Sequence, residues 1–274
     1  MTAYHRYLGA CMGLGAQIRE CENGPQALFP EIETLFPEKE GTPLDRIVSF
    51  NKKLAALVSL TIDSGRFPVV IGGDHSIAVG TWSGVKQSLG SPFSLIWIDA
   101  HLDGHTLEST PSGAIHGMPL AGLLGEGDPG MAKLLGSEPV LQPENLFLIG
   151  VRSYEPEEEA LFKRLGVKVY WIDEVKRRGL ESVVREVMSL IKTPDIGVSI
   201  DLDVIDPSEA PGVGSPEPNG LSSVELLSVL KVFRERLCAF ELVEYNPQLD
   251  FEQKTREIAY QILEEILEKQ LAVL

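Results

Sequence analysis

Two patterns of hydrophobic and polar positions alternate along the chain. The first is a short, continuous apolar run, which is typical of a strand buried on both faces. Such runs occupy residues 7–11, 67–71, 93–98, 146–150, 167–172, 196–200 and 238–243. The second is a longer segment with apolar residues at helical spacing, which predicts amphipathic helices at residues 43–64, 76–89, 180–191, 223–236 and 258–267.

This alternation predicts an α/β fold. Strands separated by helices favour a three-layer sandwich, with a mostly parallel central sheet and helices on both of its faces. The sequence contains no internal repeat and no low-complexity linker, so we expect residues 1–274 to form a single domain. Ligand sites in such sheets lie beyond the carboxyl ends of the strands.

Polar side chains gather at three of these strand ends. Asp99, His101 and Asp103 follow the run 93–98, and alternate residues of an extended backbone share one face, so we expect the three to point the same way. Asp201 and Asp203 follow the run 196–200 with the same spacing. His75 follows the run 67–71 in the motif GGDHS (72–76).

Four carboxylates and two imidazoles in one place indicate a metal site. Carboxylates a few ångströms apart raise one another's pKa values, and two divalent cations would neutralise four of them. The set is rich in oxygen and has no thiolate, which favours Mn²⁺ over Zn²⁺. Two metal ions can lower the pKa of a shared water toward neutrality. A single aspartate after a strand is usually a turn former or helix cap, a role that suits Asp74 and Asp206.

Composition narrows the partners and the location. The formal net charge is −16 and the pI is about 4.8, which argues against nucleic acid or an anionic membrane as partner. The three cysteines form no CxxC motif, which is typical of free thiols in a reducing cytosol. There is neither an apolar signal core after Met1 nor an apolar run long enough to span a membrane, so we expect a cytoplasmic protein.

Four motifs carry a family resemblance. GGDHS (72–76), DAHLD (99–103), SIDLDVIDP (199–207) and VEYNP (243–247) occur in the order and at spacings comparable to those of the ureohydrolase family, which includes arginase, agmatinase and formimidoylglutamase. The chain resembles this family from LGA (8–10), through ENGP (22–25), to the last predicted helix. The resemblance implies an arginase-like fold and a binuclear manganese centre that hydrolyses a guanidino or formimino group.

The resemblance also implies roles for individual residues. The ligands of one Mn²⁺ would be His75, Asp99, Asp103 and Asp201, and those of the other would be His101, Asp99, Asp201 and Asp203. A hydroxide bridging the two ions would attack the guanidinium carbon, with Asp103 accepting a hydrogen bond from it. Glu244 would pair with the substrate guanidinium, and His116 would protonate the leaving amine.

The family member that the chain resembles most is an arginase, which implies hydrolysis of L-arginine to L-ornithine and urea. The interval from DAHLD to SGAIHG (112–117) matches arginases without a gap. Ser112, assisted by His105, would receive the α-carboxylate, and Glu155 or Glu158 would receive the α-ammonium. Acids at residues 155–159 also fit the first turn of a solvated helix.

Several positions depart from the usual arginase pattern. Ala114 and His105 stand where asparagines are usual, Ser153 replaces an acid, and Glu217 and Asn219 replace small or apolar residues. Agmatinase, guanidinobutyrase and formimidoylglutamase are therefore the alternatives. A non-enzymatic binder on this fold is disfavoured, because every position implied in metal binding and catalysis is occupied by a suitable residue. The family resemblance further implies a homo-oligomer, a trimer or hexamer.

Overall fold

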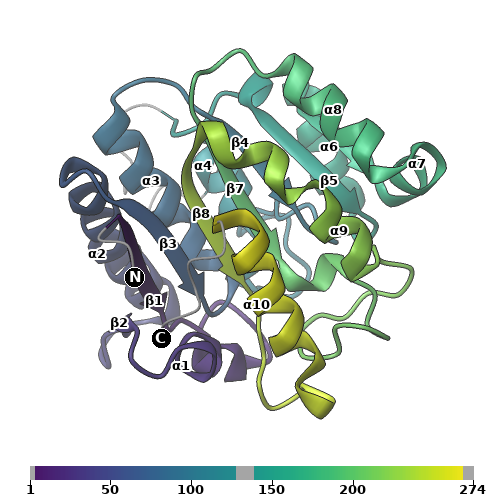
Figure 1. Ribbon diagram of the computed structural model, residues 1–274. Coiled ribbons are helices and arrows are strands. Elements are labelled where there is room, and N and C mark those ends of the chain that lie inside the picture. The colour runs from purple at the N-terminus through teal and green to yellow at the C-terminus, as the bar shows by residue number, and fades with distance from the viewer. Residues whose placement is uncertain (1–3, 128–138, 268–274) are drawn as a thin grey trace.

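The computed structural model describes residues 4–127 and 139–267, which form one eight-stranded sheet between two layers of helices (Figure 1). All strand pairings are parallel, and the order across the sheet is β2-β1-β3-β8-β7-β4-β5-β6. The strands are β1 (His5–Ala10), β2 (Glu33–Leu35), β3 (Phe67–Gly72), β4 (Ser94–Ile98), β5 (Leu146–Val151), β6 (Lys168–Trp171), β7 (Ile196–Asp201) and β8 (Leu237–Val243). The predicted fold class is confirmed.

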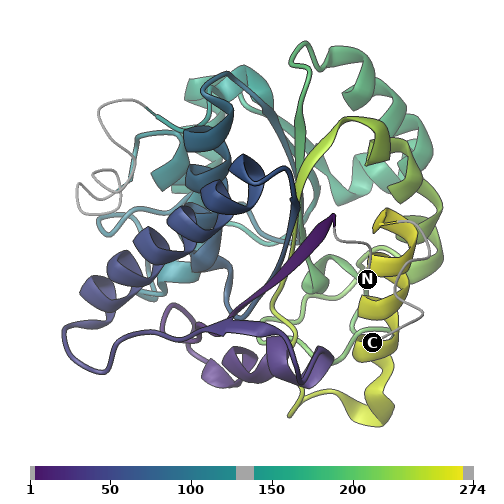
Figure 2. The same cartoon turned by 60° about the vertical axis from the view of Figure 1, so that its left-hand side comes forward.

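Helices cover both faces of this sheet. Figure 2 shows the layer that contains α2 and α3 on one side and the layer that contains α8, α9 and α10 on the other. The helices are α1 (Gly24–Leu28), α2 (Pro43–Asp63), α3 (Ala78–Leu89), α4 (Pro119–Leu123), α6 (Pro156–Leu165), α7 (Ile172–Arg178), α8 (Leu180–Leu190), α9 (Ser223–Val229) and α10 (Lys254–Leu267).

The apolar strands separate two hydrophobic cores. In β4, Leu95 and Trp97 pack into the core beneath α2 and α3, whereas Ile96 and Ile98 pack into the core beneath α8, α9 and α10. All four side chains are fully buried. Burial of each such side chain stabilises the fold by about 1.5–3 kcal/mol, so the continuous apolar run is what holds the strand at the centre of the sheet.

The structure differs from the expected elements in several places, and helices α1, α4 and α6 were not among the predicted helices. Strand β2 was not predicted, because it has three residues and pairs only with β1 at the edge of the sheet. The run 167–172 joins two elements, since Ile172 is the first residue of α7. The helix expected at 223–236 becomes a 3-10 helix after Val229. Along the described ranges, no helix has the length and apolar character needed to cross a membrane.

Candidate active site

The site lies where β3, β8, β7 and β4 end, four neighbouring strands of the sheet. His75 opens a 3-10 turn after β3, Asp99 follows β4, and Asp201 is the last residue of β7. The turn after β3 requires glycine at position 73, because a Cβ there would lie 1.9 Å from the carbonyl oxygen of Met12. Parallel strands thus bring residues that are far apart in sequence to one edge.

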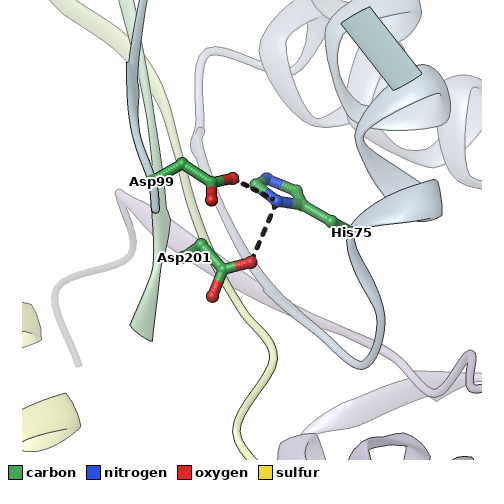
Figure 3. Close-up of side chains that lie close together, drawn as sticks. All are labelled: His75, Asp99 and Asp201. Atoms are coloured by element: carbon green, nitrogen blue, oxygen red, sulfur yellow. Dashed lines mark ion pairs between the residues drawn. The ribbon is translucent and has the colours of Figure 1, made fainter. Parts of the chain in front are cut away.

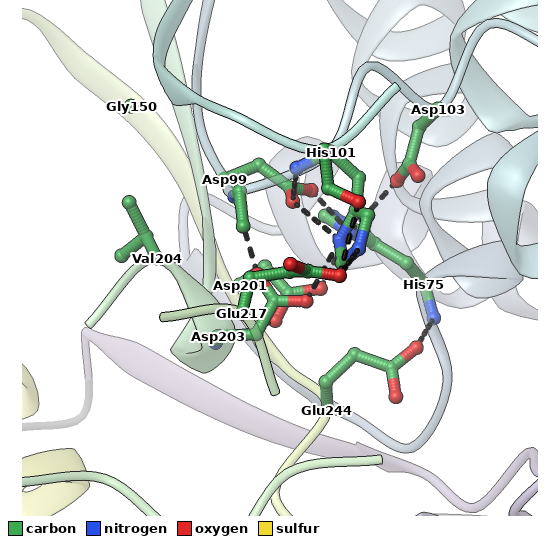
Figure 4. Close-up of polar contacts among 12 residues, drawn as sticks. His75, Asp99, His101, Asp103, Gly150, Asp201, Asp203, Val204, Glu217 and Glu244 are labelled. Carbon is green, nitrogen blue, oxygen red and sulfur yellow. Dashed lines mark hydrogen bonds and ion pairs between the residues drawn. The ribbon is translucent and has the colours of Figure 1, made fainter. Parts of the chain in front are cut away.

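The first candidate cation position lies beside one nitrogen of the His75 ring. Its Nδ1 lies 3.1 Å from Asp99 Oδ2, 3.1 Å from Asp103 Oδ2 and 3.2 Å from Asp201 Oδ2 (Figures 3 and 4). Within the described ranges, neither His75 Nδ1 nor Asp103 Oδ2 has a hydrogen-bond partner, although both atoms are buried. One ring nitrogen facing three carboxylate oxygens is an arrangement that a divalent cation would satisfy.

The second candidate position lies beside the first. His101 Nδ1 is 2.9 Å from Asp203 Oδ2 and 3.6 Å from Asp99 Oδ1. Asp99 therefore turns one oxygen toward His75 and the other toward His101. Potential ligand atoms of His75, Asp99 and Asp201 converge, as do those of Asp99, His101 and Asp203. The structure brings all six sequence-predicted ligands together.

Asp103 reaches this cluster by a different route from the one expected. Strand β4 ends at Ile98, and the extended backbone that was predicted to align residues 99, 101 and 103 is interrupted at Asp103. His101 instead pairs in an isolated parallel bridge with Ser153, and Asp103 has a φ of 50°. Glu244, just after β8, has a φ of 67°. Non-glycine residues in this left-handed region are strained, and such strain is concentrated at functional sites.

Burial and mutual repulsion perturb the carboxylates of the cluster. Burial and the charge of Asp99 raise the pKa of Asp103 to about 6. Burial and the charges of Asp203 and Asp99 raise the pKa of Asp201 well above its usual range. Burial would lower the pKa of His75, but the carboxylates of Asp103, Asp201 and Asp99 that face Nδ1 outweigh it and raise that pKa well above 6.5. Cations bound here would take the place of these protons.

A buried relay behind His75 fixes its ring. His75 Nε2 lies 2.9 Å from Ser199 Oγ, which donates to Glu241 Oε1 at 2.8 Å. The ring also stacks on Trp97 with a centroid separation of 4.0 Å, and the Trp97 indole donates to Asp99 at 2.9 Å. Sequence reasoning missed this support. The one sign of this support in the sequence is an acidic residue, Glu241, inside the apolar run 238–243.

Glu244 and His116 form a pair next to the cluster. Glu244 Oε1 accepts the backbone N–H of His75 at 2.8 Å and lies 2.9 Å from His116 Nδ1. Glu244 Oε2 is buried and has no hydrogen-bond partner in the part of the chain that is described. Burial lowers the pKa of His116, but the charge of Glu244 and its hydrogen bond outweigh that effect and raise the pKa to about 9.

A cavity of about 90 Å³ opens above these groups. Its walls include His75, His101, Asp103, His105, His116 and Glu155. His105 Nε2 contacts Glu155 Oε2 at 2.8 Å, so the proposed partners of the two α-groups of arginine here contact each other. Glu158 accepts the backbone N–H groups of Gly104 and Glu155, at 2.9 and 3.0 Å, and burial raises its pKa to about 8. Both oxygens of Glu158 are thus already engaged.

Ser112 lies apart from this group. It is exposed and lines an adjoining cavity of about 220 Å³, together with Ala114 and Gly214. The two cavities share His116 and Ser215 as lining residues. Asp74 and Asp206 are caps and turn formers, as expected, since their carboxylates accept the backbone N–H groups of Ser76 and Ser208.

A parallel α/β sheet with six histidine and aspartate side chains that could hold metal ions at its strand ends has the features of a binuclear-metal amidine hydrolase. The carboxylate oxygen of Glu244 that lacks a hydrogen-bond partner among the described residues lies beside them. The family model named Arginase family matches residues 15–268. An arginase from Bacillus caldovelox is 42% identical over 224 residues, which cover 80% of this chain and 75% of the relative. An arginase from Bacillus subtilis is 39% identical over 242 residues, covering 87% and 81%.

Solved structures agree with these relatives. The crystal structure of the Bacillus subtilis arginase superposes with a TM-score of 0.89 at 36% identity, covering 98% of this chain and 99% of that one. The native structure of the Bacillus caldovelox arginase gives a TM-score of 0.90 at 35% identity. The chain belongs to the arginase family and is an enzyme of that family's hydrolase type.

Proposed function

We propose that this enzyme hydrolyses the guanidino group of L-arginine to L-ornithine and urea with the help of two Mn²⁺ ions. The observation that carries the proposal is the buried, unpaired Oε2 of Glu244 beside the two candidate cation positions. A buried carboxylate oxygen without a donor is costly, and a guanidinium N–H would satisfy it by a charge-assisted hydrogen bond. The names of the similar proteins point to the same substrate.

The donor set supports manganese. One ion would be held by His75, Asp99, Asp103 and Asp201, and the other by His101, Asp99, Asp201 and Asp203. Asp99 belongs to both groups of converging ligand atoms, and the family resemblance implies that Asp201 would be shared as well. The six residues supply oxygen and imidazole nitrogen without any thiolate, which suits Mn²⁺. The two ions would lower the pKa of a water that both contact and so supply a nucleophile at neutral pH.

The chain's own residues would orient the reactants and move the protons. Glu244 Oε2 would hold the guanidinium so that its carbon faces the attacking oxygen. Asp103 Oδ2, which has no hydrogen-bond partner among the described residues, would accept a hydrogen bond from that oxygen. His116 donates from Nδ1 to Glu244, which leaves Nε2–H free to protonate the leaving amine of ornithine. A pKa near 9 keeps that proton on His116 at neutral pH.

The α-carboxylate and α-ammonium of arginine would bind between His105 and Glu155, in place of the direct contact between these two side chains. These side chains lie 2.8 Å apart, and a zwitterion inserted between them would offer its carboxylate to His105 and its ammonium to Glu155. Ser112 and the backbone of residues 104–115 would add to the carboxylate contact. Between the two acids considered, we assign the ammonium to Glu155, because Glu158 already accepts two backbone N–H groups.

Urea release tests the assignment. We expect L-arginine to be hydrolysed in the presence of Mn²⁺, with kcat/KM at least about 100-fold above that for agmatine, which lacks the α-carboxylate. Agmatine and 4-guanidinobutyrate would be compared in the same assay, and formimidoylglutamate, which yields formamide instead of urea, would be followed by formamide release. If any of these compounds is hydrolysed as fast as L-arginine or faster, we would assign that compound as the substrate instead of L-arginine. These compounds are included because Ala114 and His105 stand where arginases usually have asparagines.

We also propose that the enzyme is a homo-oligomer, a trimer or hexamer, as the family resemblance implies. Light scattering at micromolar concentration measures the mass directly. A mass equal to that of one 30.0 kDa chain would contradict the proposal.

A further inference from the structure

The two histidines of the candidate metal centre are supported unequally. The His75 side chain is 1% exposed and is held by Ser199 and by stacking on Trp97. The His101 side chain is 26% exposed, and its Nδ1 faces the carboxylates of Asp99 and Asp203. A metal-ligating imidazole usually donates its other N–H to a carboxylate or carbonyl, which fixes the ring and strengthens the ligand. As a metal ligand, His101 would therefore need an acceptor for its Nε2–H.

The carboxylate that faces this nitrogen belongs to Glu217, in the loop between β7 and α9. Its Oε1 lies 3.9 Å from His101 Nε2 and accepts a hydrogen bond from Ser153 Oγ at 3.0 Å (Figure 4). At 3.9 Å the contact is longer than a hydrogen bond by about 1 Å. The Glu217 side chain is 34% exposed, so it has the freedom to close that gap.

The backbone that carries Glu217 is fixed to the metal-binding turn by one guanidinium. Arg152 Nη2 donates to the carbonyl of Glu217 at 2.9 Å and to that of Asp203 at 2.7 Å. Its Nε donates to the carbonyl of Pro218 at 3.1 Å. A Cβ at Gly220 would lie 2.7 Å from Arg152 Nη2, which shows how closely the loop packs on this side chain. The loop is thus held at a set distance from Asp203.

We propose that Glu217 is a positioning residue that accepts the Nε2–H of His101 and so holds Nδ1 toward the cation that His101 shares with Asp99 and Asp203. The inference rests on the proposed metal pair. Glu217 comes from a different loop than Ser153, the residue that pairs with the His101 backbone. The part of the loop around Glu217 therefore contributes to metal affinity without itself supplying a ligand.

Calorimetric titration with Mn²⁺ alone tests the proposal on the metal-free, full-length chain. We expect the wild-type protein to bind two ions and Glu217→Ala to bind one of them about 10- to 100-fold more weakly, with the other unchanged. Glu217→Gln should lose less, because its amide oxygen still accepts a hydrogen bond. In the Glu217→Ala background, Ser153→Asp should restore affinity, since Ser153 Oγ lies 3.0 Å from the position of the lost oxygen.

Glu209→Ala is the matched control. Glu209 lies in the same loop and accepts the backbone N–H of Ser223 at 3.0 Å, so its loss loosens the loop without removing a group that faces His101. Equal weakening by Glu209→Ala, or unchanged binding of both ions by Glu217→Ala, would overturn the role of Glu217. Fewer than two ions bound by the wild-type chain would overturn the metal pair as well, so the two failures are distinguishable.

Discussion

Replacing Glu155 by Gln removes one charge from the mouth of the site and keeps its shape. The hydrogen bond from His105 holds the pKa of Glu155 below its usual range, so this group is ionised at neutral pH. A hydrogen bond to a charged partner contributes about 1.5–3 kcal/mol. The Glu155 side chain is 47% exposed, and the ammonium must displace His105, so we discount this to about 1–2 kcal/mol. That corresponds to a loss of about 5- to 30-fold in kcat/KM for L-arginine.

The assay compares L-arginine with 5-guanidinopentanoate, which is arginine without its α-amino group. Glu155→Gln should slow arginine hydrolysis and leave 5-guanidinopentanoate within about 2-fold, because that substrate has no ammonium to lose. Glu157→Gln is the control, since Glu157 is an exposed acid in the same first turn of α6. Equal losses for both substrates would refute the reasoning, because Glu155 would then shape the loop rather than bind the ammonium.

Three further changes test the centre and its scaffold. Asp99→Asn or Asp201→Asn should lose at least one of two Mn²⁺ per chain, measured by metal analysis of the Mn-loaded protein; two retained ions would exclude a bridging role. His116→Asn should lower kcat by about 10²- to 10⁴-fold with both ions still bound, and loss of metal would mean that His116 is a ligand. Gly73→Ala should destabilise the fold by about 3 kcal/mol in denaturant unfolding, because its Cβ would lie 1.9 Å from the backbone oxygen of Met12, and an unchanged midpoint would contradict this.

The sequence was sufficient for seven of the eight strands and for the grouping of the six candidate ligands, for a physical reason. A strand buried on both faces is mostly apolar, so a cluster of polar residues after the apolar run marks its end, as Asp99 does after Ile98. Parallel strands then carry such ends to one edge. Asp99 and Asp201 could therefore be predicted to be neighbours without knowing which strands pair in the sheet.

The support of the site could not be predicted in the same way. Arg152 contacts Asp203 and Glu217 through backbone carbonyls, which leave no trace in side-chain patterns. The left-handed backbone at Asp103 could not be predicted either. Local preference disfavours that conformation, and only the surrounding structure imposes it. Long-range contacts of irregular loops have no sequence period, so these features emerge only in three dimensions.

Several departures from local preference fall together in one small region. Asp103 and Glu244 adopt strained backbone conformations, Asp201 and Asp203 are buried beside like charges, and Glu241 lies within an apolar strand. Each of these costs free energy in the folded state, and the two apolar cores must offset it. A sequence selected for stability alone would relieve such conflicts separately. Their convergence on one strand edge is the physical argument that this edge is the active site, because cations and a guanidinium would satisfy all of these charges at once.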